Sequence, residues 1–355
     1  MQPSISVVIP VRNERQTLPE LLQQLLDQDY PRDRYEILVV DGQSTDGTGD
    51  LIRRRYAKTP VPVRVLDNPK RVAAAGRNLG IAAATGEILV FLNGHSSVTS
   101  HTLLADTAAL LERTGALWLC RPQPLDGPAM TRTGQVIAWA RSCWLGRGPD
   151  GVERMNSVSA ATHGAAYRRT VFHLVGGFDE NFDEGDDLEF TTRVWKAGIE
   201  AWTDSRLTVH ERPRTTLRGL LGQMVRTGRG TSRLMRKHPD CASVAQIAPL
   251  GILLGLLLAL VAWWRLSPVM ATVVSLPLLA FPLVVAVTSC QLGLQHGFRA
   301  AWRSPWVFLG IYLGQGAGLL LEYLWPTEIA AAEPMAEIVA AELGLPRARR
   351  SDRAA

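Results

Sequence analysis

The sequence predicts an α/β domain with a mostly parallel sheet, followed by helices that cross a membrane. Two short apolar runs, residues 5–9 and 37–40, each end abruptly in polar residues, as buried strands of such sheets do. Between them, leucines recur at helical spacing over residues 17–26, which completes a strand–helix–strand unit. The C-terminal third instead holds uncharged apolar runs that are long enough to span a bilayer.

The first 240 residues continue this alternation of strands and helices. Further strands are predicted at residues 63–66, 88–92 and 117–120, with an alanine-rich helix over 73–84. Residues 121–160 are rich in Pro and Gly, and their pattern assigns no element. Ligands of parallel sheets bind outside the carboxyl ends of the strands, so the polar residues after the first two strands mark a binding edge.

The motifs present exclude some common enzyme classes. The turn after the first strand carries neither the G-x-G-x-x-G dinucleotide fingerprint nor the G-x-x-x-x-G-K-[ST] phosphate loop, which disfavours a dehydrogenase or a P-loop ATPase. The cysteines show no paired spacing, so we expect reduced packing residues rather than a zinc site or disulfides. These cysteines are Cys120, Cys143, Cys241 and Cys290.

Basic residues gather just before the apolar third of the chain. The whole chain has 38 Lys and Arg against 33 Asp and Glu, a net charge of +5. Residues 206–238 hold a series of arginines with a single acid, Glu211. Because this basic run adjoins apolar sequence, the expected partner is anionic lipid or a diphosphate, and not nucleic acid.

Two apolar runs, residues 243–264 and 268–290, have bilayer-spanning length and no charged side chain, which disfavours a buried helical core. A third run, residues 305–325, is a weaker candidate because glycines interrupt it and it carries Glu322. For this third run the alternatives are a span and a re-entrant or interfacial helix. The sequence therefore predicts two or three transmembrane helices.

Charge on the flanks of these runs predicts their orientation. The basic run precedes the first span and Arg299 and Arg303 follow the second, so the positive-inside rule places both flanks in the cytoplasm. Residues 265–267 then form an external turn, and the expected location is the cell inner membrane with the catalytic domain in the cytoplasm. The expected domains are a catalytic domain at residues 1–240, a membrane region at 241–326 and a charged tail at 327–355.

Five short motifs follow one another along the catalytic domain. They are Pro-x-x-Asn-Glu at 10–14, Val-Val-Asp-Gly-x-Ser-x-Asp-Gly-Thr at 39–48, Ala-Gly-Arg-Asn-x-Gly at 75–80, Gly-Gly-Phe-Asp-Glu at 176–180 and Gly-Asp-Asp-Leu-Glu-Phe at 185–190. This order resembles the family 2 glycosyltransferases of the GT-A fold. The basic motif at 223–230 and the membrane tail resemble the subgroup of the succinoglycan-synthesis type, which builds bacterial polysaccharides. The resemblance implies a nucleotide-diphosphate sugar as donor.

The resemblance also implies a nucleotide pocket at the binding edge. Asp41 is expected to contact the base or ribose, and the arginines to pair with the diphosphate. The full expected donor set is Pro10, Asn13, Glu14, Asp41, Arg71, Arg77, Asn93, Arg226 and Arg229. An alternative for Asp41, with Ser44 and Asp46, is that these residues only cap the next helix.

An acidic cluster provides the candidate base. The resemblance aligns Asp186 and Asp187 with the family's acidic pair, and Asp187 becomes the expected base that deprotonates the acceptor hydroxyl. Clustered carboxylates raise one another's pKa, which suits this task. Glu184 is a rival on the acceptor side, and His163 is a candidate acceptor contact. The alternative is an acidic first turn that only favours the helix dipole.

The sequence departs from the family pattern where most members carry Asp-x-Asp, because it reads Asn93-Gly94-His95 there. One interpretation is a divalent metal, Mn²⁺ favoured over Mg²⁺, bound by His95, His210 and the donor's diphosphate. In the other, arginines neutralise the diphosphate. Arg226, Arg229, Arg233 and Arg236 share one helical face by their spacing.

The expected function is that of an inverting, membrane-attached hexosyltransferase-type enzyme. Its acceptor would be a glycan on a polyprenyl diphosphate, because the spans hold the site at the lipid surface. One alternative is transfer of a single sugar to polyprenyl phosphate. Another is a degenerate member that binds nucleotide-sugar or lipid without catalysis.

Overall fold

A computed structural model describes residues 2–126, 130–147, 157–159 and 164–328. The chain divides into two compact units. The first comprises residues up to 122 together with 153–209, and the second comprises residues 123–152 with 210–329. The domain boundaries predicted at residues 240 and 326 stay predictions.

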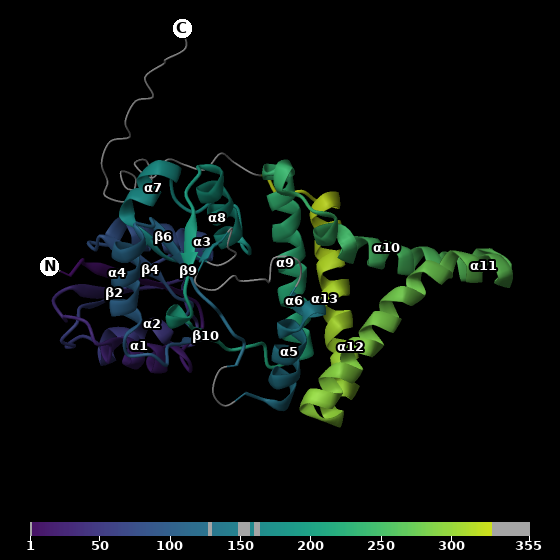
Figure 1. Cartoon of the computed structure of the whole chain (residues 1–355), viewed down its shortest axis with the longest axis horizontal. Coiled ribbons are helices and arrows are strands. Elements are labelled where there is room, and N and C mark those ends of the chain that lie inside the picture. The colour runs from purple at the N-terminus through teal and green to yellow at the C-terminus, as the bar shows by residue number, and fades with distance from the viewer. Residues whose placement is uncertain (1, 127–129, 148–156, 160–163, 329–355) are drawn as a thin grey trace, which may run out of the picture. The chain divides into compact units, whose positions relative to one another are not determined.

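The first unit is built on an eight-stranded sheet with the order β3-β2-β1-β4-β8-β6-β9-β7 (Figure 1). Its strands are β1 (Ile5–Val11), β2 (Tyr35–Asp41), β3 (Val63–Asp67), β4 (Ile88–Phe91), β6 (Trp118–Cys120), β7 (Ser157–Ser159), β8 (Gly164–Arg168) and β9 (Ala201–Thr203). Strands β1 to β4 are parallel to one another, and β8 runs antiparallel to both β4 and β6. The predicted α/β class with a mostly parallel sheet is confirmed. A further strand, β5 (Ser96–Ser97), follows β4 outside this sheet.

Helices cover both faces of the sheet, which explains the continuous apolar runs of its central strands. The helices are α1 (Leu18–Leu26), α2 (Thr48–Arg55), α3 (Ala73–Ala83), α4 (Leu103–Thr114), α7 (Arg169–Val175) and α8 (Asp186–Lys196), with a 3-10 turn, η1 (Ser205–Leu207). Val7 and Ile9 pack with α1, α2 and α4, whereas Val8 faces α3, α7 and α8. Successive strand residues therefore enter two separate cores.

The second unit consists mainly of helices. They are α5 (Arg132–Ser142), α6 (Trp144–Arg147), α9 (Leu217–Lys237), α10 (Val244–Arg265), α11 (Pro268–Ser275), α12 (Ala280–His296) and α13 (Phe298–Leu324), with 3-10 turns η2 (Pro239–Cys241) and η3 (Leu276–Leu279) and the strand β10 (His210–Glu211). Side-chain caps begin three of these helices: the hydroxyls of Thr131, Thr216 and Ser243 accept N–H bonds from residues three positions on. Helices α5 and α6 occupy a stretch to which the sequence assigned no element.

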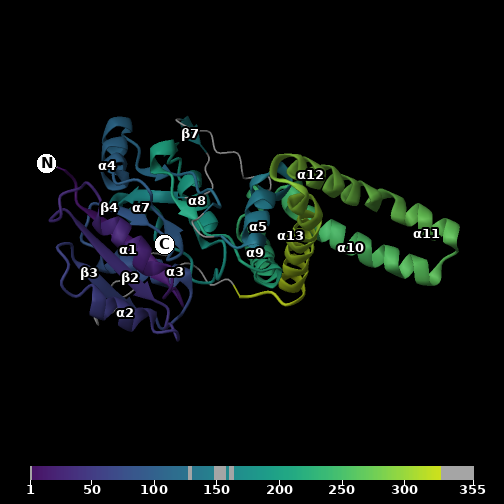
Figure 2. The same ribbon diagram turned by 90° about the horizontal axis from the view of Figure 1, so that it is seen from below.

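The second apolar run does not form one continuous helix. Helices α10 and α13 are each long and apolar enough to cross a membrane, whereas the predicted second span is divided into α11 and α12 by a 53° bend. The break falls at η3, where Pro277 removes a backbone N–H donor. With α10, the bent pair makes a hairpin that projects away from α9 and α13 in both views (Figures 1 and 2).

Helices α9 and α13 lie side by side and run in the same direction (Figures 1 and 2). Glycines set their separation. A Cβ on Gly314 would lie 2.7 Å from Met224 Cβ, and one on Gly318 would lie 2.1 Å from the carbonyl oxygen of Val225. The glycines that weakened the third run as a span are therefore small residues at a close helix–helix interface.

Replacing Gly318 with alanine is expected to lower the free energy of unfolding by about 1–3 kcal/mol, because the new methyl group must push α9 away. Gly310 is the matched control, since its nearest neighbour would be Leu220 Cδ2 at 3.8 Å. Gly310→Ala should be neutral or slightly stabilising because alanine favours the helix. Thermal unfolding of the purified protein in detergent compares the two, and equal melting temperatures would contradict the close packing.

Candidate active site

The carboxyl ends of β1, β2 and β3 lie next to one another, as the register pairs Val11 with Asp41 and Asp41 with Asp67. We call the turns that follow them, residues 12–14, 42–46 and 68–71, the donor edge. Because parallel strands end together, residues far apart in the sequence meet here.

Backbone conformation at the donor edge is unusual. Among the described residues, the non-glycine positions with positive φ are Asn13 (58°), Gln43 (56°) and Arg71 (64°), one on each turn. Such a conformation costs about 1–2 kcal/mol per residue. Bonds between the turns offset this cost: Thr45 N–H donates to Asn13 Oδ1 over 2.8 Å, and Arg71 Nε donates to Gln43 Oε1 over 2.5 Å. Strain held in this way is typical of a preformed binding site.

Asp41 is buried and organises the second turn. Its Oδ1 accepts the N–H and the hydroxyl of Ser44 over 3.0 and 2.6 Å, and its Oδ2 faces Gly49. Asp46, rather than Asp41, holds the start of α2, because its Oδ1 accepts the Thr48 N–H. Burial pushes the pKa of Asp46 upward, but bonds from Thr48 and Arg15 outweigh it and the pKa lies below its ordinary value. Contact of Asp41 with a nucleotide stays a prediction.

Glu14 joins the donor edge to the turn at residues 93–95. Its Oε1 lies 3.1 Å from His95 Nδ1, and its backbone N–H donates to Thr48 Oγ1. Gly94 permits this approach, since a Cβ there would lie 3.0 Å from Glu14 Cγ. When Nδ1 carries the proton and donates to Glu14, Nε2 holds the lone pair. Metal-binding histidines have this arrangement.

His210 lies in the second unit and shows the same pattern, with Nδ1 2.5 Å from Asp126 Oδ1. Asp126 was not singled out from the sequence, because it lies 84 positions from its partner. Within the described ranges, no three His, Cys, Asp or Glu side chains gather as a metal-binding group. Each unit therefore contains one imidazole that a carboxylate orients.

The acidic cluster lies at the start of α8, directly after Gly185. Asp186 is buried and its Oδ2 accepts a bond from Arg77 Nη1 of α3. Arg77 is buried too, and its guanidinium lies 5.4 Å from the centre of the Phe178 ring. Burial raises the pKa of Asp186, and the Arg77 guanidinium opposes the rise. Arg77 thus links α3 to α8, and its contact with a nucleotide stays a prediction.

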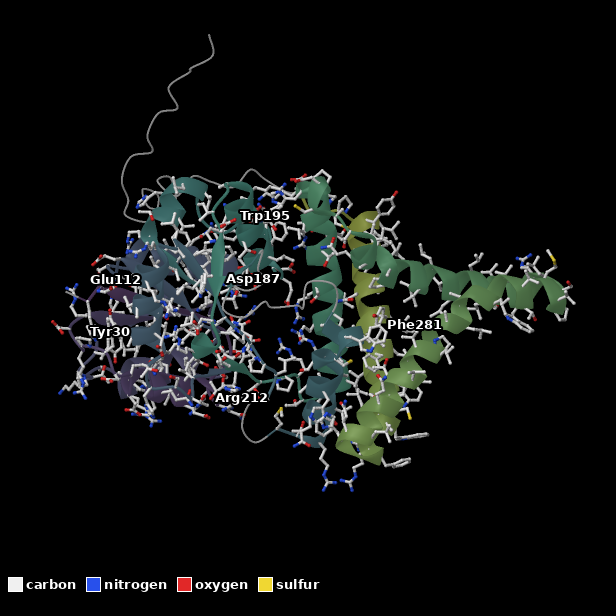
Figure 3. All side chains as sticks on the ribbon, viewed as in Figure 1. Tyr30, Glu112, Asp187, Trp195, Arg212 and Phe281 are labelled. Carbon is white, nitrogen blue, oxygen red and sulfur yellow. The ribbon has the colours of Figure 1, made fainter. Side chains whose placement is uncertain are left out.

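Asp187 is more exposed than Asp186 and lies at the head of α8 (Figure 3). Its Oδ1 accepts the N–H of Leu188 over 2.8 Å. Burial raises the pKa of the Tyr167 phenol well above its ordinary value, and the charge of Asp187 adds to the rise. Asp187 is therefore an accessible carboxylate beside a buried ion pair.

The other two acidic residues of this region, Glu189 and Glu184, differ in how deeply they are buried. Glu189 is fully buried and forms a two-bond pair with Arg193, which also donates to the carbonyl oxygens of Val175 and Gly177. Glu189 thereby fixes the loop before α8. Glu184 lies half-buried in that loop. His163 lies outside the described residues.

The arginines of α9 have different surroundings from those expected. Arg229 donates from Nε to Oε2 of Glu322 over 3.0 Å, and Arg233 and Arg236 pair with the same carboxylate. Arg229 is therefore already paired with a carboxylate. Arg226 instead lines a cavity at the start of α9.

Arg121 is a buried charged residue that was not singled out from the sequence. Its Nη2 donates to the carbonyl oxygen of Phe91 over 2.7 Å, at the ends of β4 and β6. A lone arginine directly after the apolar run at 117–120 was the available signal.

Comparison with known proteins adds to this geometry. Residues 6–176 match the family described as glycosyl transferase family 2. The succinoglycan biosynthesis protein ExoA of Rhizobium meliloti (strain 1021) is 31% identical over 274 residues, which cover 74% of this chain and 80% of that protein. A Methanococcus voltae dolichyl N-acetyl-alpha-D-glucosaminyl phosphate 3-beta-D-2,3-diacetamido-2,3-dideoxy-beta-D-glucuronosyltransferase is 23% identical, with coverage of 71% and 80%.

Among solved structures, the mannosyltransferase PcManGT from Pyrobaculum calidifontis, in complex with GDP-Man and Mn²⁺, has a similar fold. The TM-score is 0.62 at 22% identity, and the match covers 92% of this chain and 89% of that one. The fold, the order of the motifs and the long match to a relative above 30% identity all indicate the same family. The chain belongs to glycosyl transferase family 2 and is a glycosyltransferase.

Proposed function

We propose that this glycosyltransferase is an inverting enzyme that moves a sugar from a nucleotide-diphosphate sugar to a lipid-linked glycan in bacterial polysaccharide synthesis. The observation that carries the proposal is the accessible Asp187 carboxylate beside the buried Asp186–Arg77 pair. The names of the relatives support the acceptor class, since one belongs to succinoglycan biosynthesis and another acts on a dolichyl-linked sugar phosphate.

Asp187 takes the proton of the acceptor hydroxyl while that oxygen attacks the anomeric carbon. The bond from this carbon to the diphosphate oxygen breaks, and the nucleoside diphosphate leaves with the electron pair. A single displacement inverts the anomeric carbon. The ion pair of Arg77 with Asp186 fixes the start of α8 beside Asp187.

The donor edge would hold the nucleotide. Its proposed contacts are Pro10, Asn13, Glu14, Asp41, Arg71 and Asn93. Arg226 stays a predicted contact, as do Arg77 and Arg229, which each pair with a carboxylate. The strained turns support the proposal, since they hold the polar groups in place before a ligand arrives.

A divalent cation, with Mn²⁺ favoured, would be held by His95 and by the donor's diphosphate, with His210 as a second candidate ligand. These ligand atoms, imidazole nitrogens from the protein and oxygens from the diphosphate of the sugar nucleotide, suit a cation that accepts both nitrogen and oxygen ligands. When bound, the cation would neutralise charge on the leaving diphosphate. Glu14 would orient His95 through Nδ1, as carboxylates do for metal-binding histidines.

His95→Ala is expected to weaken Mn²⁺-dependent nucleotide-sugar binding by roughly 10- to 100-fold, the range found when ligand-supporting groups are lost. Titration of purified protein with and without chelator measures the effect. His101→Ala is the matched control, because His101 is exposed and its ring bonds to the backbone carbonyl of Asp27. Binding and turnover unchanged by both chelator and His95→Ala would refute the metal proposal.

Assaying the full-length protein with a panel of nucleotide sugars tests the function itself. Transfer to polyprenyl diphosphate glycans supports it, whereas transfer to polyprenyl phosphate alone supports the simpler alternative. Nucleotide binding without turnover of any donor would indicate a non-catalytic member.

We also propose an inner-membrane, multi-pass location with the catalytic domain in the cytoplasm. The apolar helix α10, the bent α11–α12 pair and the basic run before α10 support it. Labelling of Cys241 by a membrane-impermeant thiol reagent from the periplasm would contradict this orientation.

A further inference from the structure

A chain of polar contacts joins the donor edge to the loop that precedes the candidate base. We call residues 176–185, between α7 and α8, the α7–α8 loop. Both segments belong to the first unit. Lys70 lies in the third turn of the donor edge, and its Nζ donates to Oε2 of Glu180 in the α7–α8 loop over 2.6 Å. The two residues are 110 positions apart, so no local pattern in the sequence indicates their contact.

On the donor side, Asn68 fixes the turn that contains Lys70. Asn68 is buried, and its backbone N–H donates to the carbonyl oxygen of Asp41 over 2.8 Å. Its Oδ1 accepts the backbone N–H of Lys70 over 3.1 Å, and its Nδ2 donates to the carbonyl oxygen of Val72 over 2.9 Å. The backbone of Lys70 is therefore held by the same strand end that carries Asp41.

On the other side, a buried amide of α3 holds Glu180. Asn78 is fully buried, and its Nδ2 donates to Oε1 of Glu180 and to the carbonyl oxygen of Phe178, each over 2.9 Å. The Oδ1 of Asn78 accepts the N–H of Phe178 over 2.8 Å. The two carboxylate oxygens of Glu180 thus have different partners: Oε1 accepts from α3, and Oε2 accepts from the donor edge.

Phe178 extends this connection to α8. Its ring stacks on that of Phe190 in α8, with 4.4 Å between the ring centres. The guanidinium of Arg77 lies 5.4 Å from the centre of the Phe178 ring and donates to Asp186, the first residue of α8. Asp187 is the next residue of the helix. A shift of the α7–α8 loop would therefore also shift the candidate base.

The Lys70–Glu180 ion pair is more important for geometry than for stability. The Lys70 side chain is 65% exposed and the Glu180 side chain 23% exposed. Exposed ion pairs contribute little to the free energy of unfolding. Their contact nevertheless fixes the separation of two segments, one at the candidate donor site and one next to the candidate base. Catalysis is sensitive to such a separation, since a displacement of about 1 Å can reduce the rate by roughly a hundredfold.

We propose that Lys70 and Glu180 are positioning residues that set the distance between the bound nucleotide sugar and Asp187. The proposal rests on the proposed function, because it takes Asp187 as the base and the donor edge as the nucleotide site. Lys70 holds the turn at 68–71, Glu180 holds the α7–α8 loop, and their ion pair keeps the two segments in a fixed relative position during transfer.

Steady-state kinetics of the full-length protein in detergent test this role. Lys70→Met and Glu180→Gln each remove the ion pair, and glutamine can still accept the bond from Asn78. Each variant should lower kcat by roughly 10- to 100-fold with little change in the KM for the nucleotide sugar. The two effects should not add in the double variant, because both remove the same contact. Lys70→Arg should restore most of the rate.

Lys58→Met is the matched control, because Lys58 is exposed after α2 and lies outside the donor edge. It should keep the wild-type kcat. The melting temperatures of Lys70→Met and Lys58→Met should equal that of the wild type, because an exposed ion pair contributes little to stability. A loss of rate without a loss of stability distinguishes positioning from a structural role.

Hydrogen exchange provides a second measurement that needs no turnover. UDP or GDP bound at the donor edge should slow amide exchange in residues 176–185 of the wild-type protein, since the turn at 68–71 is linked to this loop. The slowing should be lost in Lys70→Met and in Glu180→Gln, and it should persist in Lys58→Met.

Equal kcat and equal nucleotide-dependent exchange in Lys70→Met, Glu180→Gln and Lys58→Met would overturn the proposal. So would a loss of rate in Lys70→Met alone, because Lys70 would then contact the donor directly. Nucleotide-dependent exchange that requires the ion pair, without turnover of any donor, would refute the proposed function and leave the coupling. Turnover that depends on Asp187 but not on Lys70 or Glu180 would refute the coupling and leave the function.

Discussion

Asp187→Asn is expected to reduce sugar transfer by roughly 10²- to 10⁴-fold, the contribution of a positioned general base. The amide keeps the shape of the side chain but cannot accept the hydroxyl proton. Nucleotide binding should persist, because the donor edge follows strands β1, β2 and β3, whereas Asp187 lies on helix α8. Initial rates with a saturating nucleotide sugar, together with a nucleotide titration, measure the two effects separately.

Asp183→Asn is the matched control, since Asp183 is exposed in the same loop. It should keep the wild-type rate. Asp186→Asn should instead act through stability, because it leaves Arg77 buried without its carboxylate. If Asp187→Asn retains wild-type activity while Glu184→Gln loses it, the base is Glu184.

Glu322→Gln is expected to lower the free energy of unfolding by about 3–5 kcal/mol, the usual effect of removing one partner from a buried ion pair. Glu322 is fully buried, and Arg233, its most buried partner, lies 3.2 Å away. Its carboxylate also accepts the N–H and the hydroxyl of Thr327. Loss of its charge removes the buried carboxylate with which Arg233 pairs. Denaturant unfolding in detergent, followed by circular dichroism, measures the change.

The matched control is Glu328→Gln, because Glu328 is exposed six positions further on. It should unfold like the wild type. Adding Arg233→Met to Glu322→Gln should recover part of the loss, since the double variant no longer buries an unpaired charge. Equal stability of Glu322→Gln and Glu328→Gln would show that the carboxylate does not hold α9 to α13.

Local patterns made the central fold predictable. The strands at 5–9 and 37–40 and the helix between them follow from apolar spacing alone, since each segment buries a face that its own sequence displays. Helix α5 was not predicted, because its sequence, with Gly134 and Arg141, has little amphipathic character. Packing against α13 stabilises the helix instead. The break at η3 was also missed, although Pro277 was the signal.

The candidate site was predictable only where its residues follow strands. The donor edge could be read from polar residues at strand ends. Ion pairs between distant parts of the chain could not be predicted from the sequence. Arg77 and Asp186 are 109 positions apart, and Arg229 and Glu322 are 93 positions apart. Three of the four arginines predicted to share one face of the helix, Arg229, Arg233 and Arg236, pair with Glu322. No local pattern shows that a carboxylate of another helix accepts their bonds.

The parallel contact of α9 with α13 bears on how often the chain crosses the bilayer. If α13 crossed the hydrocarbon core of the bilayer, α9, which packs against it, would lie in the core as well. Arg226, Arg229 and Arg233 would then be placed in the core, at a free-energy cost of about 2.5–3.5 kcal/mol for each arginine. We therefore expect α13 and α9 to lie in the headgroup region of the bilayer. Within the described part of the chain, α10 and the bent α11–α12 pair are then the segments that cross the bilayer. Two crossings make an even number, so the charged C-terminal tail returns to the leaflet from which the chain entered, where a reporter fused to Ala355 would detect it.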